Sequence, residues 1–292
     1  MPELPEVETV RRGLQRHLVG RRIVRVEVGR ERVVRRTSRE ELIAGLAGTV
    51  VEAAERRGKY LVLPLDSGEA VMIHLRMSGQ VLVAPPAAPR PPHTHVVMHL
   101  DPRGDGGNDD GAHGAHGSEL WFVDPRTFGE VVVFDPELVH DRLPELARLG
   151  IDPIADHLGV DDLRCAFGAT RRALKPLLLD QHVIAGIGNI YADEILHRAG
   201  LRPDRSAGTL DRRRLAILRD SIVGVLTDAI DAGGSTLGDA QYVDLMGHAG
   251  SYQDDHRVYG RGGERCVTCG RGWVRRVVTG GRSTHFCPVC QR

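Results

Sequence analysis

Residues 266–290, CVTCGRGWVRRVVTGGRSTHFCPVC, contain four of the five cysteines of the chain, in two C-x2-C pairs separated by 17 residues. Each pair offers two thiolates from one tight turn, and a hairpin between the pairs brings the four sulfurs together. Two disulfides or fortuitous cysteine pairs are the alternatives, and disulfides are disfavoured in a cytoplasmic protein because thiols stay reduced there. We therefore predict one structural Zn²⁺, held by Cys266, Cys269, Cys287 and Cys290, in a closed site without catalytic chemistry.

The tip of this hairpin, GGRST, carries Arg282 directly after two glycines that permit a tight turn. Residues 256–292 hold eight arginines against the single Glu264, although the formal net charge of the whole chain is zero. This end can therefore bind a polyanion, whereas an ordinary solvated hairpin is the alternative. Arginine outnumbers lysine by 37 to two in the chain, so Lys59 and Lys175 stand out.

Residues 136–235 show an apolar period of about 3.6, which indicates a helical region. Within it, LDQHVIAGIGNIYADEIL places Gly186, Gly188 and Asn189 between two expected helices. Free N–H groups at the start of the second helix can bind an anion such as a DNA phosphate. An ordinary turn with Asn189 as the N-cap is the alternative. Cys165, in the segment VDDLRCAF, is expected to be a small core residue.

Residues 21–135 contain strand-like runs separated by Gly and Pro, which predicts a β-sandwich or barrel. The stretch 101–119, DPRGDGGNDDGAHGAHGSE, joins two of these runs and holds five acidic residues against one arginine. We expect it to be a disordered hairpin insertion. No apolar run approaches the ~18 residues of a membrane span, and the N-terminus lacks a signal sequence, so we expect a cytoplasmic protein.

The chain begins MPELPEVETV, which predicts a helix over residues 5–19 because Pro5 suits the first turn and apolar residues then recur at helical spacing. Pro2 lies outside this helix. Removal of Met1 would free the secondary amine of Pro2, with the carboxylate of Glu3 beside it.

Several motifs along the chain together resemble those of bacterial formamidopyrimidine-DNA glycosylases. They are PELPEVE at 2–8, RRGKY at 56–60, HLRMSG at 74–79, DPRTFG at 124–129, GIGNIYADE at 186–194, VYGR at 258–261 and the four-cysteine hairpin. The resemblance keeps the family's order from residue 2 to residue 291, and only the insertion at 101–119 lies outside it.

The resemblance implies an α+β fold: an N-terminal β-sandwich with an N-terminal helix, a helical helix-two-turn-helix domain, and a C-terminal β-hairpin zinc finger. The corresponding domains are expected at residues 1–135, 136–235 and 250–292. It also implies a base-excision repair enzyme that removes oxidised purines, chiefly 8-oxoguanine and formamidopyrimidines, from double-stranded DNA and cuts the abasic strand by β- and δ-elimination. A monomer without an organic cofactor is expected, and the acidic insertion should point away from the DNA.

The catalytic positions of the family match Pro2, Glu3, Lys59 and Arg282. The amine of Pro2 would attack C1′ of the damaged nucleotide, since an α-amino group with a reference pKa of about 7.7 to 8.0 is partly neutral at cellular pH. Glu3 would donate a proton, Lys59 would assist β-elimination and contact phosphate, and Arg282 would bind phosphate during δ-elimination. Glu6 would position the site at the DNA, although acidic residues in a first turn also simply stabilise a helix.

An enzyme that acts on a base takes it out of the stack, and the resemblance assigns Met77, Arg126 and Phe128 to the space left behind. The apolar pair would act as wedges and the arginine would hydrogen-bond the orphaned cytosine, with core positions as the alternative for the apolar pair. Further DNA contacts are expected at His74, His93, Arg171, Lys175 and Asn189. A core histidine is the alternative for His74. The family often has a basic residue where this chain has Gly238, so lesion recognition can differ.

Two other functions remain open from the residues. One is an endonuclease VIII-like glycosylase for oxidised pyrimidines, a sister family that carries glycine in place of Leu4. The other is a zinc-dependent DNA-binding protein without catalysis, which would result if Met1 were retained and blocked the nucleophile.

Overall fold

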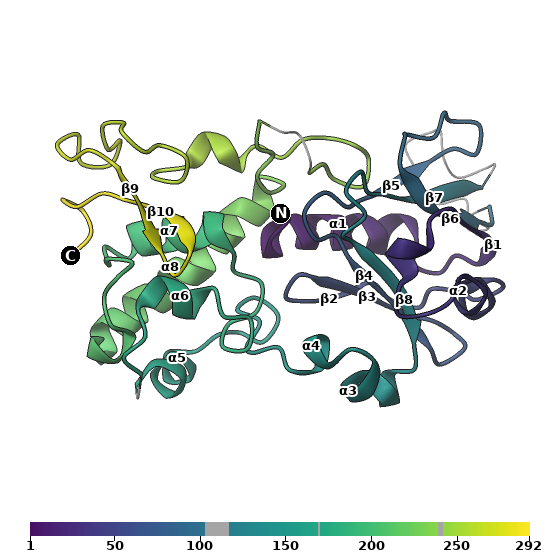
Figure 1. Ribbon diagram of the computed structural model, residues 1–292, viewed down its shortest axis with the longest axis horizontal. Helices are drawn as coiled ribbons and strands as arrows, with labels where there is room; N and C mark the ends of the chain where they lie inside the picture. Colours follow the sequence, from purple (N-terminus) through teal and green to yellow (C-terminus); the bar gives the residue numbers. More distant parts are fainter. Residues whose placement is uncertain (103–116, 169, 239–241) are drawn as a thin grey trace. The chain divides into compact units, whose positions relative to one another are not determined.

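The computed structural model describes residues 1–102, 117–168, 170–238 and 242–292 (Figure 1). The chain divides into two compact units, Met1–Arg148 with Gly233–Gly250, and Leu149–Ala232 with Ser251–Arg292. The first unit thus extends past the expected boundary at residue 135 and includes a second segment, 233–250. The second unit combines the helical region with the cysteine hairpin, which we had expected to be separate domains.

The first unit contains two four-stranded antiparallel sheets, as the strand-like runs between Gly and Pro residues predicted. Their strand orders are β1(Ile23–Val28)-β6(Thr94–Leu100)-β7(Ser118–Val123)-β5(Gln80–Ala84) and β2(Glu55–Arg57)-β3(Tyr60–Pro64)-β4(Ala70–His74)-β8(Glu130–Phe134). Short helices accompany the sheets: η1 (Glu31–Val34), α2 (Arg39–Leu46), η2 (Pro136–Leu138), α3 (Val139–Arg142) and α4 (Pro144–Ala147). The helical region expected from residue 136 begins with these last three short elements, because Pro144 stands inside the run and starts a separate helix.

Helix α1 (Leu4–His17) packs its apolar stripe into the core of this unit. Val7, Val10 and Leu14 recur at helical spacing and are buried with residues of both sheets. Leu245 of segment 233–250 joins the same core, and a Cβ on Gly13 of this helix would lie 2.8 Å from Cβ of Leu245. The expected N-terminal helix is therefore confirmed, and it forms part of the sandwich core.

Strands β6 and β7 form the hairpin from which the acidic insertion extends, with Leu100 paired to Ser118. Buried Arg21 closes the base of this hairpin by donating to the carbonyl of Asp101 and to the hydroxyl of Ser118. Residues 103–116 lie outside the described residues, so the expected disorder and direction of the insertion stay predictions.

The second unit is mainly helical and ends in a two-stranded sheet. Its elements are α5 (Val160–Phe167), α6 (Leu174–Leu178), α7 (Asn189–Arg198), η3 (Ala207–Thr209), α8 (Arg212–Asp231), η4 (Tyr252–Asp255), β9 (Arg275–Thr279) and β10 (Arg282–Phe286). The expectation for Cys165 was wrong, because this thiol is exposed on α5. Leu163 and Phe167, four residues apart, fill the buried face of that short helix.

Across the described ranges of the chain, no helix combines the length and the apolar character that crossing a membrane requires.

Candidate active site

The N-terminal end of α1 carries the expected catalytic pair, Pro2 and Glu3, and both residues are buried. The carboxylate of Glu6 accepts hydrogen bonds from the backbone N of Glu3 at 2.8 Å and from the backbone N of Ser235 at 2.7 Å. Gly234 has a φ of +82°, and a Cβ there would lie 2.8 Å from Oε1 of Glu6, so a glycine is required at this approach. Glu6 therefore attaches the chain next to Pro2 to segment 233–250.

A buried ion pair links the same helix to the motif that contains Lys59. Arg56 pairs with Glu8 of α1 at 3.0 Å and donates to the carbonyl of Gly58 at 3.1 Å. Burial raises the pKa of Glu8, but hydrogen bonds from Arg11 and Arg56 outweigh it and hold that pKa below its ordinary value. Lys59 itself is buried and lies directly before the first residue of β3. Helix α1 and the turn before Lys59 are thus held together by charge.

The contacts of His74 favour the core alternative over a direct DNA contact. Its ring is buried and packs edge-on against Tyr60, with centroids 4.3 Å apart, and Nδ1 accepts from the backbone N of Arg76 at 2.9 Å. Burial, followed by the charges of Arg76 and Lys59, lowers the pKa of His74 well below its ordinary value. The imidazole is therefore neutral at physiological pH.

Three exposed side chains in the first unit are those expected to fill the space of an extruded base. Met77 and Phe128 are each 38% exposed, which excludes the core alternative for both side chains. The guanidinium of Arg126 lies over the Phe128 ring, 5.0 Å from its centroid. His93, another expected DNA contact, is also exposed. These side chains are available to a ligand.

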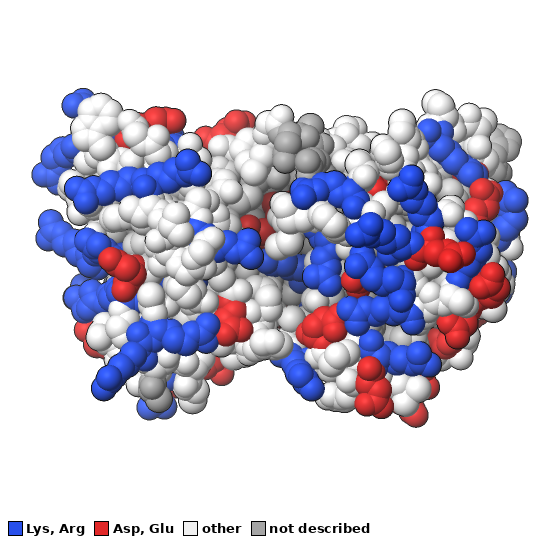
Figure 2. Space-filling view, viewed as in Figure 1, with Lys and Arg blue, Asp and Glu red and all other residues white. Residues whose placement is uncertain are grey.

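Arginines that the sequence analysis did not single out surround buried Glu130 at the start of β8. Arg35, Arg36 and Arg76 approach its carboxylate at 3.8, 3.2 and 3.4 Å. Arg35 also donates to the carbonyl of Phe128 at 3.0 Å. In Figure 2, lysine and arginine side chains gather over the part of the first unit where Figure 1 labels β4 and β8. This surface is suited to a polyanion, despite the zero net charge of the chain.

In the second unit, the glycine turn ends where α7 begins. Gly188 is the N-cap and Asn189 is the first helical residue, so the N-cap alternative for Asn189 is wrong. The side chain of Gln181 shapes the turn by accepting from the N of Gly186 at 2.9 Å and donating to the carbonyl of Ile187 at 2.8 Å. Nδ2 of Asn189 lies 3.3 Å from the hydroxyl of Ser283, next to Arg282 on β10. The N-terminus of α7 and the strand β10 are thus neighbours.

Two further expected DNA contacts of this unit differ in exposure. Arg171 is exposed, whereas the side chain of Lys175 is completely buried. Nζ of Lys175 donates to Asp193 and to the carbonyl of Ser283, both at 2.7 Å. Asp193 also accepts from the backbone N of His285 at 2.8 Å. The prediction for Lys175 is therefore corrected: its ammonium group pairs with a buried carboxylate and supports the Arg282 hairpin, and it cannot reach a phosphate.

The four cysteines of the hairpin form a compact cluster with all Sγ atoms within 4.8 Å of one another. Sγ atoms of Cys266 and Cys290 are 3.8 Å apart, as are those of Cys269 and Cys287. A tetrahedral ion with metal–sulfur bonds of ~2.3 Å requires an edge of about 3.8 Å. The backbone N–H of Gly272 lowers the pKa of Cys269 to about 6, whereas burial raises the pKa of Cys287 and of Cys290, so the spacing of the sulfurs is the stronger indication of a metal site. The donor set therefore fits a metal ion.

Gly280 and Gly281, with φ of +57° and +75°, form the expected tight turn.

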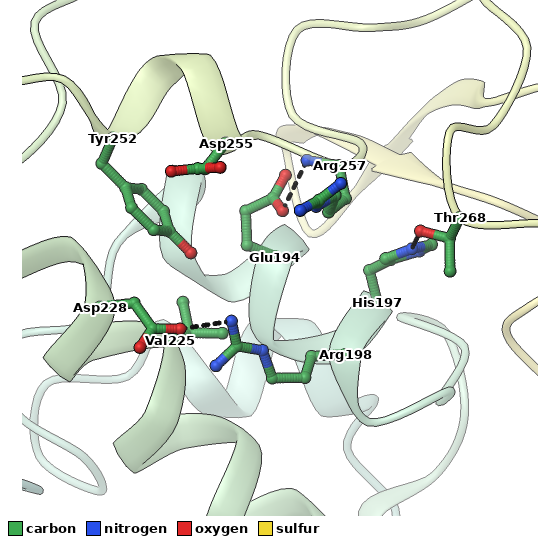
Figure 3. A pocket seen from close by; sticks show the side chains of 9 residues that line it. All are labelled: Glu194, His197, Arg198, Val225, Asp228, Tyr252, Asp255, Arg257 and Thr268. Atoms are coloured by element: carbon green, nitrogen blue, oxygen red, sulfur yellow. Dashed lines mark hydrogen bonds and ion pairs between the residues drawn. The ribbon is translucent and has the colours of Figure 1, made fainter. Parts of the chain in front are cut away.

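A cavity of about 430 Å³ lies in the second unit, and its lining residues include none of the predicted site residues (Figure 3). Its wall includes Glu194, the last residue of the GIGNIYADE motif. The Glu194 carboxylate accepts three backbone hydrogen bonds of 2.8 to 2.9 Å, from Arg257, Val258 and Tyr259. This explains why the GIGNIYADE and VYGR motifs occur together. Sequence analysis missed this link because the partners are more than sixty residues apart.

Comparisons with known proteins agree with this geometry. Family models for the formamidopyrimidine-DNA glycosylase N-terminal domain and for the formamidopyrimidine-DNA glycosylase H2TH domain match residues 1–131 and 149–241. The chain belongs to the formamidopyrimidine-DNA glycosylase family. A formamidopyrimidine-DNA glycosylase of Corynebacterium jeikeium (strain K411) is 42% identical over 305 residues, with both chains covered to 100%.

Solved structures extend this likeness to the fold. A mutant of Lactococcus lactis FPG in complex with Fapy-dG-containing DNA has a TM-score of 0.85 and 34% identity, with both chains covered to 100%. Lactococcus lactis Fpg in complex with abasic-site-containing DNA also has a TM-score of 0.85 and 34% identity, with both chains covered to 99%. The expected α+β fold with a helix-two-turn-helix domain is confirmed, and the protein is a DNA glycosylase.

Proposed function

We propose that this glycosylase excises oxidised purines, chiefly 8-oxoguanine and formamidopyrimidines, from double-stranded DNA and then cuts the abasic strand. The N-terminal end of α1 carries this proposal, because Pro2 and Glu3 are held there by Glu6, in the same unit as the exposed Met77 and Phe128. The complexes of Lactococcus lactis FPG with Fapy-dG and with abasic-site DNA support the substrate and the intermediate.

In the proposed reaction the amine of Pro2, freed by removal of Met1, attacks C1′ of the damaged nucleotide. The bond from C1′ to the base breaks as the leaving group takes up a proton, with Glu3 as the donor at the sugar. The nitrogen loses its single proton on attack, Glu3 protonates O4′, and the C1′–O4′ bond then breaks, so the ring-opened Pro2–C1′ adduct is an iminium. It keeps its positive charge because the nitrogen has no further proton to lose. That charge accepts the electrons when the C2′ proton leaves and the 3′-phosphate is expelled. A second elimination expels the 5′-phosphate.

Lys59 and Arg282 have proposed roles at the phosphates. Lys59 follows a turn fixed by the Arg56–Glu8 ion pair, which supports a defined position during β-elimination. Arg282 is exposed at the hairpin tip, and Lys175 and Asp193 support the strand that carries it. Asn189 and Arg171 are proposed phosphate contacts of the helix-two-turn-helix domain.

We propose that the four-cysteine cluster holds Zn²⁺, since four thiolates at tetrahedral spacing form a typical structural zinc site. Bound zinc would supply no reaction step, because no open coordination position remains. It would fold the hairpin and thereby present Arg282.

A strand-cleavage assay tests the lesion class. The protein is incubated with duplexes that carry a single 8-oxoguanine opposite cytosine or a single thymine glycol. Cleavage of the 8-oxoguanine duplex at a rate well above that of the thymine glycol duplex is expected. The reverse preference would assign the protein to oxidised pyrimidines, and binding without cleavage of either duplex would contradict catalysis.

A further inference from the structure

Asp124, the first residue of the DPRTFG motif, is completely buried and binds three donors. Its Oδ1 accepts from the hydroxyl of Ser78 at 2.5 Å and from the backbone N of Arg126 at 3.2 Å. Its Oδ2 accepts from the backbone N of Gly129 at 2.7 Å. A buried carboxylate is tolerated only with such partners, and hydrogen bonds to a charged acceptor are among the strong ones in proteins. One side chain thus closes loop 124–129 and ties it to the turn that contains Met77.

The backbone of Asp124 adds a third connection. Its N donates to the carbonyl of His93 at 3.0 Å, and its carbonyl accepts from the N of Thr127 at 3.2 Å. The turns that carry Met77 and His93 and the loop that carries Arg126 therefore all meet at this residue. Each of these turns exposes a side chain expected to contact DNA.

Loop 124–129 needs this support because its backbone is strained. Thr127 has a φ of +54°, in the left-handed region that a β-branched residue rarely adopts. Gly129 is equally constrained, since a Cβ there would lie 2.6 Å from the Phe122 ring and 3.1 Å from Oδ2 of Asp124. The exposed Phe128 lies between these two residues, so the direction of its ring depends on the hydrogen bonds to Asp124.

We propose that Asp124 is a positioning residue for base extrusion, which holds the Met77 turn and the Arg126–Phe128 loop at a fixed spacing. This inference rests on the proposed function. Wedges must enter the stack at the place that the base leaves, and Arg126 must reach the base opposite, so a shift of one turn relative to the other weakens both actions. Asp124 acts through these side chains and touches no reacting atom.

The test compares Asp124→Asn with wild type in single-turnover reactions on two duplexes. One duplex carries 8-oxoguanine opposite cytosine, and the other carries a preformed abasic site, which costs less to extrude because no base is stacked there. An amide cannot accept from all of Ser78, Arg126 and Gly129. We expect excision of 8-oxoguanine to slow about tenfold or more, and abasic-site cleavage to change by less than about threefold.

The matched control is Asp152→Asn, which makes the same chemical change at a turn of the second unit. Asp152 is 1% exposed and accepts from the backbone N of Ile154 and of Ala155. This control should lower the two cleavage rates by equal factors or leave both unchanged.

A second readout is the ratio of excision rates opposite cytosine and opposite adenine. Asp124→Asn should lower this ratio, because Arg126 loses its fixed place, whereas a general loss of stability would leave the ratio unchanged. If Asp124→Asn does not fold, Ser78→Ala replaces it, since that change removes only the bond between the two turns. Equal effects on both duplexes, with an unchanged ratio, would overturn the proposal. A wild-type protein that cleaves abasic DNA but not 8-oxoguanine would instead refute the proposed lesion class.

Discussion

The N-terminal end of α1 and the cysteine hairpin reach fixed geometry by opposite means. Residues 2–8 lie on a large apolar core and are held by carboxylates whose partners are remote in sequence, such as Glu6 with Ser235 and Glu8 with Arg56. The hairpin at 266–290 has a small core and four thiolates placed by local spacing. The first region is held by the protein's own core and hydrogen bonds, whereas the second would need the proposed metal ion for its stability.

Loss of the metal should have the largest effect and should be confined to the second unit. Structural zinc contributes about 10–16 kcal/mol in small domains, which is more than a hairpin of this size can replace. Cys290→Ser should therefore abolish stoichiometric metal binding and weaken DNA binding strongly. Metal analysis and fluorescence anisotropy on abasic-site DNA measure this, and Cys165→Ser, at an exposed cysteine outside the cluster, is the control. Tight DNA binding by the metal-free variant would show that the hairpin folds without metal.

Glu3→Gln should damage chemistry and leave the architecture intact. The neutral side chain keeps its size but cannot deliver a proton, so excision of 8-oxoguanine should fall about 10²–10⁴-fold. Binding to abasic-site DNA should stay within about threefold of wild type, since a single uncharged replacement removes little ground-state affinity. An excision rate equal to that of the wild type would show that Glu3 is not the proton donor.

The same two regions show which structural features the sequence could predict and which it could not. Four cysteines at short spacing predicted their own cluster, and the glycine pair before Arg282 predicted the turn, because both signals are local. The motifs located Met77, Arg126 and Phe128, but Asp124, which joins their turns, depends on a contact with Ser78 that is 46 residues away. Lys175 was misassigned because sequence gives a lysine's charge but not its burial opposite Asp193.

Lys175→Met should destabilise the second unit by about 3–5 kcal/mol, because it leaves Asp193 as a buried charge without its ion-pair partner. Urea unfolding, followed by tryptophan fluorescence, measures the change. The double variant Lys175→Met with Asp193→Leu should recover much of the loss, since apolar replacement of both partners removes the unpaired charge. If the variant kept native stability and only bound DNA more weakly, the result would support the original prediction that Lys175 contacts a phosphate.

Glu8→Gln should give a smaller effect, visible through its pH dependence. The pKa of Glu8 in the folded protein lies below its ordinary value of 4.5, so the ionised form stabilises the fold above that pH. The contribution is lost as the pH falls through the folded pKa. At neutral pH the variant should be less stable by about 1–2 kcal/mol, and this difference should vanish on acidification. Exposed Glu55→Gln is the control. A pH-independent difference would contradict the ion pair.

We propose that the first unit acts through the amine of Pro2, and covalent trapping during the reaction tests this proposal. Borohydride reduction is carried out during turnover of a duplex that carries 8-oxoguanine opposite cytosine, and the adduct is located by peptide mapping. We expect one stable protein–DNA adduct, on Pro2 of a chain that lacks Met1. An adduct on a lysine, or excision without any adduct, would contradict it.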